Sequence, residues 1–100
     1  MRLSDETHDY HCSTCQQRGG LCMEALWLSQ RVARGLATRA ADLPEGFELT
    51  ATTRFTGCAR DCAVELSVTG QRVEVATRTD GANARVIADR RADRSLAVGA

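Results

Sequence analysis

The sequence predicts a small sandwich of helices and strands, in the α/β or α+β class, whose cysteine-bearing loops meet at one end. Three patterns predict it: a helical apolar stripe over residues 21–41, strict alternation over residues 47–55, and renewed alternation over residues 64–75. A chain of 100 residues can bury one modest core. We find no repeat or linker that would require a second domain, so residues 1–100 are taken as one domain.

The first predicted element is a helix over residues 21–41, because its apolar positions recur at three- and four-residue spacing and share one face. The stripe consists of Leu21, Cys22, Ala25, Leu26, Ser29, Val32, Ala33, Leu36, Ala37 and Ala40. Pro44 ends the helix, since proline lacks an N–H group and biases the residue before it toward extended geometry.

The middle of the chain predicts strands. Within residues 47–55 every second residue is apolar or threonine, which is typical of a half-buried strand. Residues 64–68 and 73–75 alternate in the same way around a turn at residues 69–71, which predicts a hairpin.

The C-terminal part predicts a second helix over residues 82–93, begun near Asp80, and a strand over residues 84–88 is the alternative. The inner side of this helix would consist of Ala84, Ile87, Ala88 and Arg91. The alternation of His8, Tyr10 and Cys12 gives only a weak hint of a short strand, and residues 95–100 predict a fraying tail.

The charge balance excludes some partners. Thirteen basic residues match thirteen acidic ones, so nothing favours nucleic acid or an anionic membrane surface. We see no secretory signal and no apolar run of membrane-spanning length. Five cysteines are an odd number, which fits a disulfide framework poorly and a reducing compartment well, so we expect a cytoplasmic protein.

The cysteines form two groups and carry the functional prediction. Cys12, Cys15 and Cys22 precede and begin the first helix, and Cys58 and Cys62 flank a short segment before the hairpin. Thiolates gathered from two distant loops suit an iron-sulfur cluster or zinc. A cluster needs four thiolate ligands and the chain has five cysteines, so each cysteine is a candidate ligand. Which two come from the first group stays open, and Cys22 can also be read as a small buried hydrophobe.

A 2Fe-2S cluster is preferred over zinc. Zinc knuckles usually combine two short Cys-x-x-Cys turns, whereas three residues separate Cys58 from Cys62. A catalytic dithiol at Cys12 and Cys15 would follow an apolar strand, and the residues before Cys12 are polar. We identify no catalytic residue, because no phosphate loop, nucleophile elbow or zinc-protease motif is present.

Other side chains near the cysteines have two readings each. Arg60 lies between Cys58 and Cys62, where it could bind the negative charge of a cluster or simply pair with Asp61. His8 and His11 could replace a thiolate ligand, although a surface histidine in a polar segment is more often solvated. Trp27 belongs to the first helix, as core or interface.

The segment from Cys58 to Leu66, followed by Gly70 and a further strand, resembles small metal-binding proteins of unknown function that are similar to thioredoxin-like 2Fe-2S ferredoxins. Residues 11–16 are similar to the Cys-Thr-Thr-Cys opening of that family. The resemblance spans about residues 10–90 and implies a thioredoxin-like sandwich with a mixed sheet, a C-terminal hairpin and two helices. Arg54 stands where that family usually carries a further cysteine, and Cys22 would take over as ligand. Such ferredoxins are often homodimers.

A second resemblance ranks behind the first. Residues 56–63, preceded by Cys15, Cys22 and a helix, are similar to the iron-sulfur and siroheme segment of sulfite and nitrite reductases and of precorrin-3B synthase. It implies a 4Fe-4S cluster bridged to a tetrapyrrole, but those proteins are several times longer.

The sequence therefore predicts an iron-sulfur protein that acts as an electron carrier or as a redox- or metal-responsive accessory protein, rather than an enzyme. Its partner would be an unidentified redox protein. The alternative is a zinc-stabilised binding module with no redox role.

Overall fold

A computed structural model describes residues 2–15, 20–56, 62–79 and 82–90. The elements are β1 (Arg2–Ser4), β2 (His8–Cys12), β3 (Thr14–Cys15), β4 (Gly20–Leu21), α1 (Met23–Thr38), the 3₁₀ helix η1 (Ala40–Asp42), β5 (Glu48–Phe55), β6 (Cys62–Thr69), β7 (Arg72–Thr79) and β8 (Ala82–Arg90).

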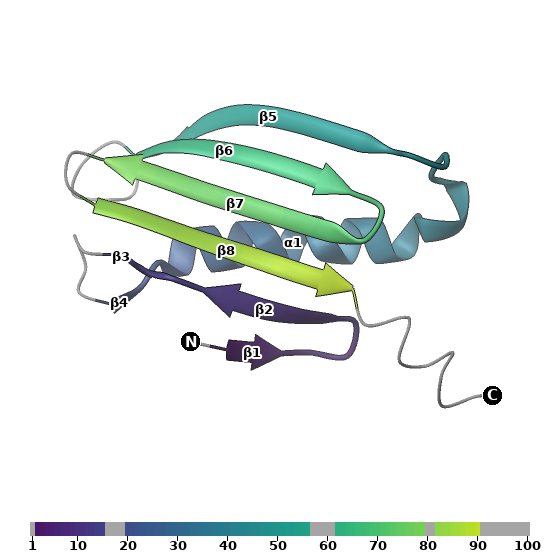
Figure 1. Cartoon of the computed structure of the whole chain (residues 1–100), viewed down its shortest axis with the longest axis horizontal. Helices are drawn as coiled ribbons and strands as arrows, with labels where there is room; N and C mark the ends of the chain where they lie inside the picture. The colour runs from purple at the N-terminus through teal and green to yellow at the C-terminus, as the bar shows by residue number, and fades with distance from the viewer. Residues whose placement is uncertain (1, 16–19, 57–61, 80–81, 91–100) are drawn as a thin grey trace.

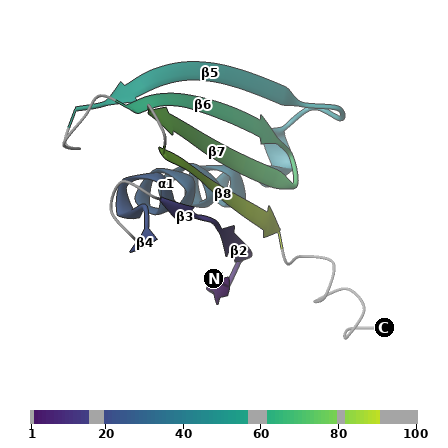
Figure 2. The same cartoon turned by 60° about the vertical axis from the view of Figure 1, so that its left-hand side comes forward.

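Six strands form one sheet in the order β1-β2-β8-β7-β6-β5, and every neighbouring pair is antiparallel. The short strands β3 and β4 pair separately as a hairpin. Helix α1 lies across one face of the sheet and packs against β7 and β8 (Figure 1). Turned by 60°, the molecule shows β5 and β6 rising away from the helix (Figure 2).

The core lies between α1 and the inner face of the sheet. Alternate residues of the central strands point inward, and Val73, Val75 and Val86 are fully buried. They meet Ala25 and Ala33 of α1, whose small side chains let the helix approach the sheet closely. Period-two and period-3.6 patterns thus bury their apolar faces against each other.

The predicted fold class is wrong. The sheet is antiparallel throughout and not mixed, and the described residues contain one α-helix instead of two. The thioredoxin-like sandwich implied by the resemblance is therefore not the architecture of this chain. Strand β2, near the start of the chain, pairs with β8, the last of the described strands.

The error comes from the predicted helix over residues 82–93. Residues 82–90 form β8, in which Ala84, Val86 and Ala88 are buried and Ile87 points to the opposite face. Strands β2 and β7 flank β8 on both sides, so their hydrogen bonds override its alanine-rich helical composition. Residues 91–93 lie outside the described residues.

The other predicted elements are confirmed within a few residues. The first helix spans Met23–Thr38 and continues into η1. The alternating strand is β5, and the hairpin is β6 and β7. Gly46, in the turn before β5, has a φ of 78°, which side-chain-bearing residues adopt only at a cost.

Helix α1 packs against β7 and β8, the two central strands of the six-stranded sheet. Leu28 and Val32 of α1 are only partly buried. All residues of β5 except Phe55 are exposed, so both faces of this strand are open.

Candidate thiol site

The described cysteines come from four elements at one end of the sheet. Cys12 ends β2, Cys15 belongs to β3, Cys22 precedes α1, and Cys62 begins β6. In Figure 1 the end of β2, the β3–β4 hairpin, the start of α1 and the start of β6 all lie at the left. The described cysteine-bearing segments therefore lie at one end of the sheet, whereas the segment that carries Cys58 lies outside the described residues.

Cys15 and Cys22 are the closest match to a ligand pair. Cys15 lies opposite Gly20, and Cys22 continues β4 with an extended backbone, φ −79° and ψ 100°. Two residues apart on one strand share a face, so Cys22 points to the same side of the hairpin as Cys15, at a diagonal Cα separation of about 7–8 Å. Both are buried, at 5% and 1% exposure, in the same core cluster.

Cys12 and Cys62 lie far apart on the same inner face. Cys12 of β2 is paired with Val86 of β8, and the same row of paired residues continues through Val75 of β7 to Leu66 of β6. Cys62 lies on β6 as well, four residues before Leu66. Three strand spacings and four residues along a strand amount to about 20 Å in an unbent sheet. Two thiolates on one zinc ion lie within about 4.6 Å, so these two cysteines do not share an ion in this conformation.

No three His, Cys, Asp or Glu side chains in the described part of the chain are grouped closely enough to hold a metal ion. Cys58 and Arg60, both predicted at the site, lie outside the described residues. Burial raises the pKa of the Cys12 thiol, which favours its neutral form.

The two histidines do not accompany the cysteines. His8 begins β2, opposite Arg90 and at the other end of that strand from Cys12, with its Nδ1 2.9 Å from Thr7 Oγ1. His11 points to the outer face, where its Nε2 lies 3.6 Å from Asp89 Oδ2. Neither arrangement supports a histidine ligand. Trp27 is 51% exposed and so does not belong to the core.

Sequence reasoning missed a polar cluster at the β1–β2 turn. The Asp5 carboxylate accepts hydrogen bonds from the backbone N–H groups of Thr7 and His8, at 2.8 and 2.7 Å, and from the Tyr10 hydroxyl. An aspartate two and three residues before these amides is a signal for such a turn. These hydrogen bonds hold the start of β2, the strand that carries Cys12, against the turn before it.

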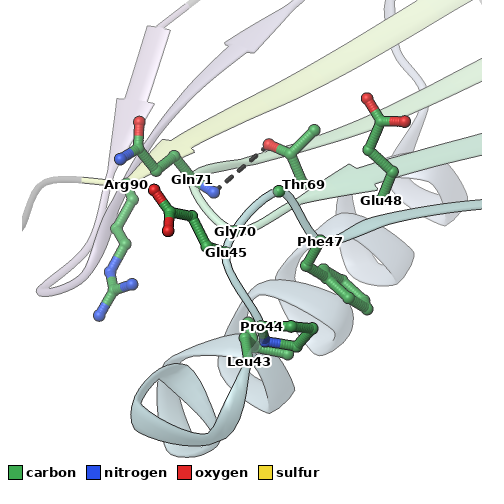
Figure 3. A pocket seen from close by; sticks show the side chains of 10 residues that line it. Leu43, Pro44, Glu45, Phe47, Glu48, Thr69, Gly70, Gln71 and Arg90 are labelled. Carbon is green, nitrogen blue, oxygen red and sulfur yellow. Dashed lines mark hydrogen bonds between the residues drawn. The ribbon is translucent and has the colours of Figure 1, made fainter.

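A hollow of about 450 Å³, shown in Figure 3, lies at the other end of the sheet. The loop over residues 43–48, the turn over residues 69–71 and Arg90 line it, and the backbone N–H of Gln71 bonds Thr69 Oγ1 at 3.3 Å. Its described lining contains no cysteine or histidine, so it is separate from the thiol end.

Comparison with protein-family models, curated proteins and solved structures gives no match. Within the described residues, no helix has the length and apolarity needed to cross a membrane.

Proposed function

We propose that this chain is a cytoplasmic metal-binding protein that uses thiolate ligands. The observation that supports it most is the buried pair of Cys15 and Cys22, which share one face of the β3–β4 hairpin at the start of α1. Cys62 points to the inner face of the sheet from a strand remote in sequence, at the same end.

The start of α1 suits thiolates for an electrostatic reason. The unpaired N–H groups and the helix dipole place partial positive charge at a helix N-terminus, which lowers the free energy of an anion there. Cys22 occupies the N-cap position of this 16-residue helix. A dipole at this position favours a thiolate over a thiol.

A 2Fe-2S cluster is the first candidate, with Cys15 and Cys22 as upstream ligands and Cys58 and Cys62 as downstream ligands. Cys58 is included as a ligand only because of its spacing from Cys62 in the sequence. Since no three described ligands are grouped, binding requires Cys62 to approach Cys22. When bound, the cluster would supply one-electron transfer, as in an electron carrier or a redox-responsive accessory protein.

Structural zinc is the second candidate, and the burial of Cys15 and Cys22 favours it. Closed sites with four thiolates and no open position are typical of structural zinc. In that case the metal would hold the β3–β4 hairpin to the sheet without a redox role.

The test is to purify the protein anaerobically and to measure iron, acid-labile sulfide, zinc and visible absorption. Equal iron and sulfide with absorption that dithionite bleaches would support the cluster, and one zinc per colourless chain would support the second candidate. A colourless protein without bound metal, even after reconstitution with iron and sulfide or with zinc, would end both.

Single Cys→Ser variants identify the ligands. We expect Cys15→Ser, Cys22→Ser and Cys62→Ser to lose the metal. Cys12→Ser is the matched control and should retain it, because Cys12 lies about 20 Å from Cys62 across the sheet. Metal loss in Cys12→Ser with retention in Cys15→Ser would overturn this ligand assignment.

A further inference from the structure

Strand β5 is an edge of the sheet that no described strand covers. It is eight residues long, and all of its residues except Phe55 are exposed. An edge strand of this length presents a row of unpaired backbone N–H and C=O groups to solvent. The strand at the opposite edge, β1, is only three residues long.

The side chains of β5 are complementary to themselves. Thr50 and Thr52 flank the central Ala51, Leu49 and Thr53 come next, and the charged residues Glu48 and Arg54 follow at equal distance on either side. Residues at equal distance from the centre of a strand lie opposite each other when two copies pair antiparallel about that centre. Each Glu48 would then face Arg54 of the second copy.

We propose that two copies of this chain associate through β5, antiparallel, with Ala51 on the two-fold axis. Only the register centred on Ala51 places Glu48 opposite Arg54, and it does so twice because the axis repeats the contact. Opposite charges and paired threonines across neighbouring strands are each stabilising. Arg54 already interacts within its own chain, and a guanidinium with five N–H donors can serve both contacts.

The pairing also covers apolar side chains of β5 that are exposed in one copy. Leu49 and Ala51 face Val68 and Leu66 of β6, so they belong to the inner face of the sheet. A two-fold axis perpendicular to the sheet keeps inner faces together, so both α1 helices lie on one side. Leu49, which is 48% exposed in one copy, then has a strand on each side. This assembly is an isologous dimer with a continuous sheet.

The test is sedimentation of the full chain over a range of concentrations, with a reductant present to prevent intermolecular disulfides. We expect a monomer–dimer equilibrium in the wild type. Glu48→Arg and Arg54→Glu should each weaken the dimer by about tenfold or more, because like charges then face each other across the axis. The double variant E48R/R54E exchanges the two charges and should recover most of the wild-type affinity.

The control is Arg2→Glu on β1, which reverses a charge at the other edge and should leave the dimer intact. Amide hydrogen exchange supplies a second measurement, since β5 amides should exchange faster on dilution. A wild-type chain that stays monomeric at about millimolar concentration would overturn the proposal. Failure of the charge exchange to restore affinity, or a dimer broken by Arg2→Glu, would overturn it as well.

Discussion

The hydroxyl of Tyr10 donates a 2.7 Å hydrogen bond to Oδ2 of Asp5, which ties the middle of β2 to the turn before it. Tyr10 is 1% exposed, and burial and this hydrogen bond raise its pKa. Burial alone would raise the pKa of Asp5, but the hydrogen bonds from Tyr10, Thr7 and His8 lower it to about 2.

Replacing Tyr10 by phenylalanine tests this bond. The variant keeps the ring in the core but removes one donor from a charged acceptor, which we expect to lower the free energy of unfolding by about 1–2 kcal/mol. Urea unfolding of Tyr10→Phe, Asp5→Asn and the double variant measures the coupling. Additive single effects would show that the two groups do not act as a pair.

Acidification should destabilise the fold in two steps. Burial, the largest cause, lowers the pKa of His8 below 6.5, so its contribution is complete above pH 6.5 and is lost as the pH falls below that value. The pKa of Asp5 falls from 3.8 to about 2, so its contribution is complete above pH 3.8 and is lost toward pH 2. Urea midpoints between pH 7.5 and pH 2.5 report both steps. His8→Gln should remove the upper step alone, and an unchanged upper step would contradict this assignment.

Two glycines should respond to alanine in opposite directions. Gly35 lies within α1 and an added Cβ would meet nothing within 4 Å, so Gly35→Ala should raise the free energy of unfolding by about 1 kcal/mol. Gly46 also has open space but a φ of 78°, so Gly46→Ala should lower it by about 1 kcal/mol. Thermal or urea unfolding distinguishes these outcomes, and equal signs would refute the argument.

Cys22→Ser should leave the metal-free fold at least as stable as the wild type. Cys22 is the N-cap residue of α1 but its side chain makes no capping hydrogen bond. A serine hydroxyl there can accept from the N–H groups of Glu24 or Ala25, a contact worth about 1 kcal/mol. Urea unfolding in the presence of a chelator measures it, with Cys22→Ala as the control without a cap. A serine variant less stable than the alanine variant would argue against the cap.

The sequence predicted those elements whose pattern is self-contained. The apolar residues of helix α1 repeat at helical spacing, and those of strand β5 alternate at every second position. The type of each element therefore followed from local residues alone. The type of strand β8 did not, because its alanines, Ala84 and Ala88, and the charged residues next to them, Arg85 and Asp89, fit a helix as well as a strand. Its state depends on two neighbouring strands, one of them nearly the whole chain away.

The candidate site was predictable in part for the same reason. Spacing identified the cysteine groups, and the topology brings the described segments that carry them to one end of the sheet. Spacing could not choose among Cys12, Cys15 and Cys22, since that choice depends on the β3–β4 register and on the extended backbone at Cys22. Nor could it show that Cys12 and Cys62 lie on strands separated by two others.

The pairing of β2 with β8, in which His8 faces Arg90, determines the order in which the molecule can be assembled. The β1–β2 hairpin is synthesised before β8 and therefore has no strand to pair with until β8 has been translated. Strands β5 to β8 are joined by short connections and can form early, whereas closing the loop between β2 and β8 costs the most chain entropy. We therefore expect the β1–β2 hairpin to be the last part of the sheet to dock during folding.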